Sequence, residues 1–360
     1  MSAFAGLPEQ PRALHLLEAA VTAPAHAYLL SGPTGSGKRR YADRFAAALL
    51  ECPPHRIETR THPDLFVLEP EGQGILIEGA RRLRRDLHLR PFEADRRVYL
   101  ILDAHLLRDE SANALLKSLE DPPEYGVLVL VSDHAERMLP TIRSRLQTIE
   151  FRRYRTAVLE AATGDPLAAR AALGDLARAT ALATDPAAAE RRRLYLELAR
   201  GVTTDPAFDP SRAGALVLDA SNQRAREAAA AVVGERDARL GSVDDPKDEK
   251  ALRKRYEDRA KREARRAEWD ELRLAVDTIA LWYHDVLAAA LGAEEAVINS
   301  DTAGGLSDAT SRGGARHAAR ALQTVGDVRR SLELNVHPVL AIEALFHRLA
   351  ELRESTPQGV

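Results

Sequence analysis

Residues 27–39 read AYLLSGPTGSGKR, an apolar run that leads through glycines to a lysine and an arginine. The run Ala27–Leu30 predicts a short buried strand, and the pattern from Arg39 to Leu50 predicts a helix directly after it. The loop between them fits the pattern G-x-x-x-x-G-K, which binds phosphate when a strand precedes it and a helix follows it. The stretch therefore predicts an α/β nucleotide-binding fold with a P-loop.

The candidate phosphate loop is formed by Gly32, Pro33, Thr34, Gly35, Ser36, Gly37 and Lys38. Its glycines let backbone N–H groups converge on phosphate oxygens, and Lys38 is placed to reach the β- and γ-phosphates. The next residue, usually a Ser or Thr whose hydroxyl binds Mg²⁺, is Arg39, which has only donors and a charge that repels the metal. The loop is predicted to leave room for ATP or ADP with a weak hold on Mg²⁺. A glycine turn that binds nothing is the alternative.

Two further apolar runs predict strands of the same sheet, Val98–Leu102 and Val127–Val131. Between them, Glu110–Leu119 predicts a helix that ends before Pro122. Strands that alternate with helices indicate a parallel sheet covered by helices.

Asp103 follows the first of these strands and is available for a metal ion. In active P-loop proteins of this broad class the next residue is a Glu that activates the attacking water, and here it is Ala104. His105 is a possible base, although a histidine beside a strand end more often packs or caps. Loss of the metal-binding hydroxyl and of the water-activating carboxylate both affect the chemical step, and each commonly costs about two or more orders of magnitude in rate. We therefore expect no ATP hydrolysis by this chain alone.

The remainder of the chain is helical by pattern. We expect a nucleotide-binding-type domain over residues 1–151, a small helical lid over 152–186 and an all-helical domain over 187–360. Within the last, residues 299–314 are rich in Gly, Ser, Asp and Thr and predict a loop. Residues 247–273 carry many charges of both signs, typical of a solvated helix, with contact to DNA as the alternative.

Composition restricts the class of protein further. The 360 residues are 45% hydrophobic, 29% charged and 5% aromatic, as in a globular, helix-rich protein. A net charge of −3 offers no overall basic surface, so work on DNA would need partners. The single cysteine, Cys52, excludes an internal disulfide and a Cys-ligated zinc site. No apolar leader or membrane-spanning run is present, and we expect a cytoplasmic protein without a metal site.

A second group of motifs follows the phosphate loop. Residues 113–123 read NALLKSLEDPP and residues 142–145 read IRSR. In this order, the motifs over residues 26–151 resemble those of bacterial clamp-loader AAA+ subunits. In that family the Ser-Arg pair supplies an arginine to the γ-phosphate in the next subunit, a role that falls on Arg145. The following residue, Cys in most of the family, is Leu146 here, which leaves the arginine intact. A surface arginine in a salt bridge is the alternative.

Other motifs are most similar to those of the delta-prime subunits of DNA polymerase III. They are THPDL at 61–65, GILIE at 74–78, WYHD at 282–285 and NVHP at 335–338. Many relatives carry a four-cysteine zinc module, which one cysteine cannot form, so we expect no zinc. The resemblance also implies that the C-terminal helices form a collar, and it marks Arg178 in a lid turn and Ser132 at a strand end as nucleotide-sensing candidates. A simple cap is the alternative for Ser132.

The resemblance implies a hetero-oligomer with gamma/tau-type motor subunits and a delta-type subunit. Through that complex, the chain would assist the loading of a sliding clamp on primed DNA. Its ATP site would be degenerate, and its Arg145 would act on a neighbour's ATP. The alternatives are an autonomous P-loop ATPase or kinase, which would need a carboxylate such as Asp109 or Glu110 near Asp103, and a motor-type loader subunit, which Arg39 and Ala104 disfavour.

Overall fold

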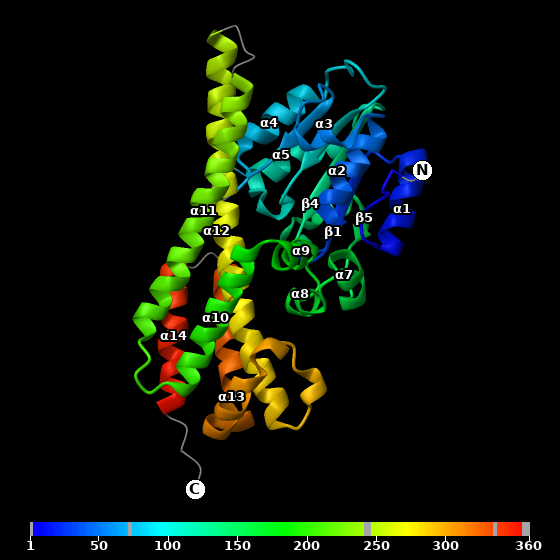
Figure 1. Cartoon of the computed structure of the whole chain (residues 1–360). Helices are drawn as coiled ribbons and strands as arrows, with labels where there is room; N and C mark the ends of the chain where they lie inside the picture. Colours follow the sequence, from blue (N-terminus) through cyan, green and yellow to red (C-terminus); the bar gives the residue numbers. More distant parts are fainter. Residues whose placement is uncertain (1–2, 71–73, 241–245, 334–336, 355–360) are drawn as a thin grey trace. The chain divides into compact units, whose positions relative to one another are not determined.

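The computed structural model describes residues 3–70, 74–240, 246–333 and 337–354. The chain divides into two compact units, Met1–Ala183 and Thr184–Val360 (Figure 1). The segment expected to form a lid falls almost entirely within the first unit. The finer division into three domains stays a prediction.

The first unit is built on a five-stranded parallel sheet in the order β2-β3-β4-β1-β5. The strands are β1 (Ala27–Ser31), β2 (Leu65–Leu68), β3 (Arg97–Ile101), β4 (Gly126–Ser132) and β5 (Gln147–Glu150). In β1, Leu30 lies opposite Val131 of β4 on one side and Ile149 of β5 on the other. The predicted parallel sheet is confirmed, and β2 and β5 are strands that the sequence patterns did not reveal.

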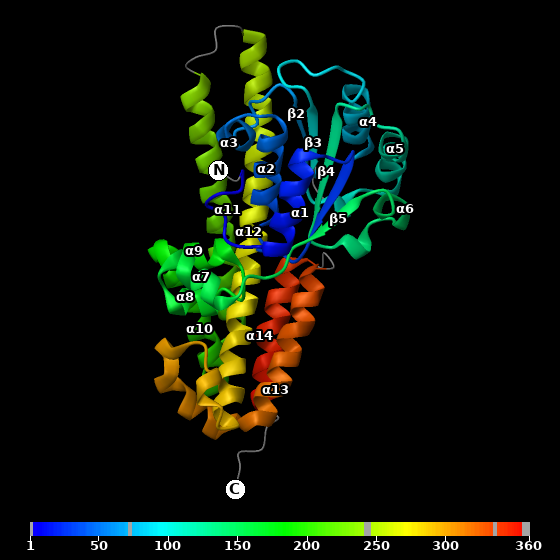
Figure 2. The ribbon, with the colours of Figure 1, turned by 90° about the vertical axis from the view of Figure 1, so that its right-hand side faces the viewer.

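Helices cover both faces of this sheet, and its central strands β3, β4 and β1 are accordingly mostly apolar. The helices of the first unit are α1 (Pro11–Thr22), α2 (Lys38–Leu49), α3 (Pro54–Glu58), α4 (Ile77–Asp86), α5 (Asp109–Glu120), α6 (Pro140–Arg143), α7 (Thr156–Thr163), α8 (Pro166–Ala171) and α9 (Leu176–Thr184). Figure 2 shows α1 and α2 on one face of the sheet and α4 and α5 on the other. Alternate residues of a strand therefore enter different cores: Leu100 packs with the helices of the first face and Tyr99 with those of the second.

The described residues of the second unit form helices and the turns that connect them, with no strand. Its helices are α10 (Pro186–Thr204), α11 (Pro210–Leu240), α12 (Pro246–Ala290), α13 (Leu306–Glu333) and α14 (Pro338–Glu354), with short 3₁₀ turns at Glu294–Ala296 and Ser300–Gly305. The core gathers large aromatic side chains, including Tyr195, Trp282, Tyr283 and Phe346. The predicted helical C-terminal region is confirmed, and none of its helices, nor any other in the described chain, has the length and apolarity needed to cross a membrane.

The expected loop over residues 299–314 is wrong. That segment forms a 3₁₀ turn and the start of α13, because Leu306 and Ala309 are buried in the core and hold the chain helical despite its polar composition. Gly314, at φ 59°, interrupts the helix. Residues 335 and 336 of the NVHP motif lie outside the described residues.

The charged stretch 247–273 is part of α12, which continues without a break into the predicted helix over 272–291. It pairs side by side with α11 (Figure 1), through a thin apolar seam formed by Val232, Tyr256 and Ala260. Ion pairs such as Arg259 with Glu235 cross between the two helices. These contacts agree with the interpretation of a largely solvated helix.

Asp285, in the WYHD motif, is fully buried in α12 and fixes the turn that follows this helix. Its carboxylate accepts hydrogen bonds from the backbone N–H groups of Ile298 and Asn299, both at 2.8 Å, and from the side-chain amide of Asn299 at 2.7 Å. One buried acceptor group therefore satisfies three donors, and its loss would strand them.

Replacing Asp285 with Ala should lower the free energy of unfolding of the second unit by about 3 kcal/mol, since buried donors lose their acceptor. The measurement is a urea titration followed by tryptophan fluorescence, which reports this unit because Trp269 and Trp282 are the only tryptophans. Asp327→Ala is the control, because Asp327 makes only an exposed i,i+3 ion pair with Arg330. An unchanged midpoint for Asp285→Ala would contradict the assignment.

Candidate functional site

The phosphate loop, Gly32–Lys38, connects β1 to α2 as the sequence pattern requires. Gly35 and Gly37 have φ values of 79° and 81°, in the left-handed region that glycine adopts without strain. The side of Gly37 that would carry a Cβ faces the Tyr154 hydroxyl. The first unit thus packs closely around the loop. Gly35 and Gly37 are required because their φ values are positive and because a Cβ would clash with neighbouring side chains.

Lys38 is only 4% exposed and is held by the first unit itself. Its ammonium donates to the carbonyl oxygen of Pro33 at 3.0 Å and forms an ion pair with Asp133, whose other oxygen accepts a 2.7 Å hydrogen bond from the Thr34 hydroxyl. Burial raises the pKa of Asp133, but Lys38 and Thr34 outweigh burial and hold it below its usual value. The Lys38 ammonium, which was predicted to reach phosphate, is therefore paired with the Asp133 carboxylate.

Asp133 was not among the residues predicted from the sequence. It follows β4 directly, and β4 is the neighbour of β1 in the sheet. Since the carboxyl ends of adjacent parallel strands lie together, its position beside Ser132 was the signal that could have identified it.

Arg39 occupies the first turn of α2 and is half-buried. Its guanidinium donates to Glu69 at 2.7 Å, just beyond the end of β2. We expected a charge that repels a metal ion, and the structure shows that Glu69 compensates this charge within the fold. The weak hold on Mg²⁺ stays a prediction, since the Arg39 side chain brings no oxygen ligand to the loop.

Ser132, at the end of β4, contacts residues that follow β3 and β4. The Ser132 hydroxyl accepts a 3.1 Å hydrogen bond from the His134 N–H and lies 3.3 Å from Nδ1 of His105. Burial lowers the pKa of His105, which favours its neutral form. Asp103 takes a left-handed conformation, φ 51°, before the buried Ala104. These contacts agree with a local capping role for Ser132.

The lid lies directly on the phosphate loop. The N–H of Leu176 points to the carbonyl oxygen of Gly35 at 3.4 Å, and the side of Gly35 that would carry a Cβ is filled by the Asp175 side chain. The Asp175 carboxylate also caps α9 by accepting the Arg178 N–H at 3.0 Å. Arg178 thus lies in the first turn of α9 after a residue that covers Gly35, and Asp175 adds a carboxylate there; the nucleotide-sensing role of Arg178 stays a prediction.

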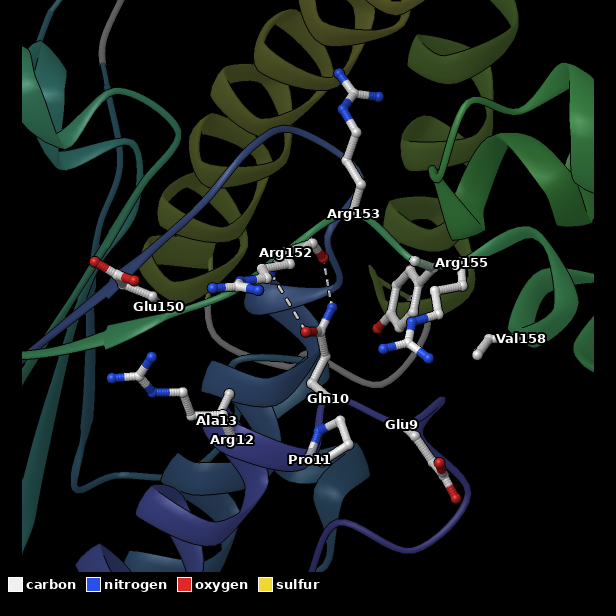
Figure 3. Close-up of a pocket in the computed structure, with 11 residues that line it drawn as sticks. Glu9, Gln10, Pro11, Arg12, Ala13, Glu150, Arg152, Arg153, Arg155 and Val158 are labelled. Carbon is white, nitrogen blue, oxygen red and sulfur yellow. Dashed lines mark hydrogen bonds between the residues drawn. The ribbon is translucent and has the colours of Figure 1, made fainter.

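Gln10 joins the phosphate loop to the chain after β5. Its amide donates to the carbonyl oxygen of Ser36 at 3.1 Å. It also donates to the carbonyl oxygen of Arg152 at 2.6 Å and accepts from the Arg152 N–H (Figure 3). Beside it is an open cavity of about 440 Å³. The cavity is lined by Glu9, Gln10, Pro11, Arg12, Ala13, Glu150, Arg152, Arg153, Tyr154, Arg155 and Val158. Neither Gln10 nor this arginine-rich cavity was predicted.

Arg145 lies elsewhere in the unit, in the turn between α6 and β5. Its guanidinium donates to the Thr141 carbonyl oxygen at 2.8 Å and to Glu120 at 2.6 Å. Both Arg145 and Glu120 are partly exposed. Within the described chain, the guanidinium bonds to α5, to α6 and to Ser144 at the end of α6, and not to the phosphate loop.

The sheet, the phosphate loop between β1 and α2, and the adjoining helical lid define a P-loop fold of the AAA+ type, as predicted. A solved structure, the DNA polymerase III gamma subunit-related protein of Thermotoga maritima, has the same fold. It aligns with a TM-score of 0.51 at 16% identity, over 95% of this chain and 99% of its own.

The sequence comparisons are more specific. Residues 9–155 match the family described as "DNA polymerase III, delta subunit". The delta' subunit of Pseudomonas aeruginosa is 42% identical over 135 residues, which is 34% of this chain and 41% of that protein. The delta' subunit of Bacillus subtilis is 32% identical over 157 residues, 39% of this chain and 47% of that protein. This region is therefore related to the DNA polymerase III delta-prime subunits, and the predicted resemblance is confirmed.

The gamma/tau subunit of Mycobacterium tuberculosis is also similar, with 33% identity over 141 residues. The matches span less than half the length of each of these three relatives. The similarity to the delta-prime family is thus shown for residues 9–155, which contain the phosphate loop.

Asp133→Asn should destabilise the first unit by about 3 kcal/mol at neutral pH, because Lys38 is left buried without its counter-charge. Since the folded pKa of Asp133 is lowered, its stabilisation is complete above the ordinary Asp pKa and is lost as the pH falls through the folded value. When the pH is lowered below about 4, the free energy of unfolding should therefore fall less for the variant than for the wild type.

The measurement is a urea titration by far-UV circular dichroism at several pH values, with the exposed Asp95→Asn as control. If the wild type and Asp133→Asn gave parallel profiles, the ion pair would not contribute as the structure indicates.

Proposed function

We propose that this chain is a delta-prime-like subunit of a DNA polymerase III clamp loader. It would assist the loading of a sliding clamp on primed DNA as one member of a hetero-oligomer with gamma/tau-type and delta-type subunits. The relation of residues 9–155 to delta-prime subunits carries this proposal. The contacts around the phosphate loop refine it.

The ATP site is proposed to be degenerate. The loop keeps the glycines and the lysine that phosphates need, but Lys38 would have to exchange Asp133 for a phosphate, and Asp175 adds a second carboxylate beside Gly35. Arg39 gives Mg²⁺ no ligand, and Ala104 provides no group to activate water. These features leave ATP or ADP binding open to this loop and oppose hydrolysis.

The isolated chain should release no phosphate from ATP above the rate of a Lys38→Met/Asp133→Asn double variant. The double variant removes both charges of the pair, so neither is left buried alone. The measurement is phosphate release with Mg²⁺ and ATP. Robust hydrolysis by the wild type that the double variant abolishes would support the autonomous P-loop ATPase instead.

Arg145 is proposed to act on ATP that a neighbouring motor subunit holds. Its guanidinium is partly exposed. It bonds to the Thr141 carbonyl oxygen in α6 and forms an ion pair with Glu120. A surface ion pair of this kind contributes only about 0–1 kcal/mol, so Glu120 can release the arginine at little cost. A guanidinium stabilises the charge that develops on a transferring phosphoryl group.

Arg145→Ala should lower the clamp- and DNA-stimulated ATPase rate of the reconstituted complex by at least about tenfold. Arg145→Lys should not restore it, since the planar fork is lost. Arg143→Ala is the matched control, because Arg143 lies two residues away at the end of α6 and donates a long 3.4 Å bond to Ala135. An unchanged rate with Arg145→Ala, in a complex that assembles normally, would refute the role in trans.

The chain is also proposed to contact DNA itself, through the exposed face of α4. Arg81, Arg84 and Arg85 are exposed on this helix, whose opposite face buries Ala80 and Leu83. None of the three forms an ion pair with a residue in the described part of the chain. The net charge of −3 therefore conceals a local row of cations suited to a phosphate backbone.

Replacing Arg81, Arg84 and Arg85 together with Ala should weaken binding of the complex to primed DNA and reduce the slope of log K against log salt by about two to three. Fluorescence anisotropy over a salt series measures both. A triple Ala variant of the exposed Arg316, Arg320 and Arg330 on α13 is the charge-matched control. Equal slopes for the two variants would place the DNA contact elsewhere.

A further inference from the structure

The facing ends of α11 and α12 extend beyond the other helices of the second unit (Figure 1). The main core of this unit includes α11 only as far as Ala220 and α12 only from Trp269 onward. Residues 222–240 and 246–268 therefore form a two-helix arm outside that core, about 30 Å long. The small apolar seam within the arm adds little to folding, so stability does not explain its length.

Polar contacts across the seam hold the two helices of the arm in register. Arg239 donates to the Tyr256 hydroxyl at 3.1 Å, and Arg259 forms an ion pair with Glu235 at 2.6 Å. The Arg259 guanidinium also lies 5.9 Å from the centre of the Tyr256 ring. The α12 side of the arm therefore presents a fixed outer face, and the charge of Arg259 is compensated within the arm.

The outer face of α12 is strongly basic. Residues 250–266 contain nine Arg and Lys against three Asp and Glu, in a chain whose net charge is −3. Four of these cations are exposed and form no ion pair with a residue in the described part of the chain. These four residues, which we call the basic stripe, are Lys250, Lys254, Lys261 and Arg265.

The basic stripe lies along one face of α12, away from the seam. Its members follow Lys250 by 4, 11 and 15 residues, which places all four within an arc of about 60° on a helix. Leu252, Tyr256 and Ala260 lie on the opposite side and enter the seam. The stripe is about 22 Å long, and one strand of B-DNA presents about six phosphates over that distance.

We propose that the basic stripe binds the phosphate backbone of duplex DNA. Each ammonium or guanidinium that meets a phosphate releases a counterion, which favours binding without any base contact. The described residues of the arm include no exposed large hydrophobic side chain. Since protein interfaces concentrate their affinity in aromatic and apolar anchors, the composition of this face favours DNA over an acidic protein.

This surface goes beyond the contact that we propose for α4, because it belongs to the second unit. It takes up the alternative that the charge pattern of residues 247–273 left open. Its test needs only the full chain and a duplex, so a failure of the clamp-loader assignment would not affect it.

Fluorescence anisotropy of a labelled duplex longer than the stripe, over a salt series, tests the proposal with the full chain. Replacing all four residues of the basic stripe with Gln should weaken binding at least about tenfold and reduce the slope of log K against log salt by about three to four. Gln has a helix propensity close to that of Lys and Arg, so far-UV circular dichroism should show an unchanged helix content.

The charge-matched control replaces four exposed cations elsewhere in the second unit with Gln. They are Arg212, Arg316, Arg320 and Arg348. This control variant should keep the wild-type slope. Equal losses of slope for the two variants, or no loss for the stripe variant, would overturn the proposal.

Neutralisation of the acids that flank the basic stripe gives a test of opposite sign. Glu257 and Asp258 are exposed beside it and form no ion pair with a residue in the described ranges. Glu257→Gln combined with Asp258→Asn should tighten DNA binding about threefold or more at low salt, because both acids repel the phosphates. Unchanged or weaker binding would contradict a phosphate contact at this face.

Combination of the stripe variant with the triple Ala variant of α4 separates the two DNA contacts. If both surfaces bind, the losses of slope should add, because the residues belong to different units. If the contact through α4 is wrong, the loss due to the stripe should remain alone. A stripe variant that binds DNA like the wild type but loses a protein subunit from the reconstituted complex would assign this face to an acidic protein and refute the DNA contact.

Discussion

The parallel pairing of β1 with β4 is the constraint on which the rest of the first unit depends. It places the start of the phosphate loop beside the end of β4, so that Lys38 and Asp133 meet although they are far apart in the chain. A lysine buried without this partner would be costly, and the ion pair explains how the loop is stable in the protein's own fold. The same pairing underlies our proposal of a degenerate ATP site, because it gives Lys38 a carboxylate partner.

The charged side chains of Lys38 and Arg39, in and directly after the phosphate loop, are paired within the first unit. Asp133 compensates Lys38, Glu69 compensates Arg39, and Asp175 of the lid fills the side of Gly35. Each of these contacts joins the loop to a different element, β4, β2 or α9. The loop is thereby tied to the sheet and to the lid of the first unit.

The functions that we propose for the first unit therefore lie on its surface. Arg145 is held by a weak, exposed ion pair, the arginines of α4 face solvent, and the buried Asp64 accepts hydrogen bonds from the backbone N–H groups of residues 92–94. Buried carboxylates fix the backbone, and exposed cations are left to act on other molecules. In the second unit, Asp285 has the same kind of structural role.

Local patterns in the sequence determined the phosphate loop, the strands β1, β3 and β4, and the helical second unit. They also indicated the resemblance to delta-prime subunits that the sequence comparisons confirmed. These features follow from short-range periodicity and glycine placement, which neighbouring residues fix. The strands β2 and β5 were missed because they are only four residues long, and the polar segment 299–314 was expected to be a loop because composition does not reveal that Leu306 and Ala309 enter a core. Only the tertiary structure decided that Asp133 meets Lys38, that Asp175 covers Gly35 and that Asp64 orders the backbone of residues 92–94. Each of these contacts joins residues distant in sequence, and their proximity depends on strand order and packing, which no local pattern encodes.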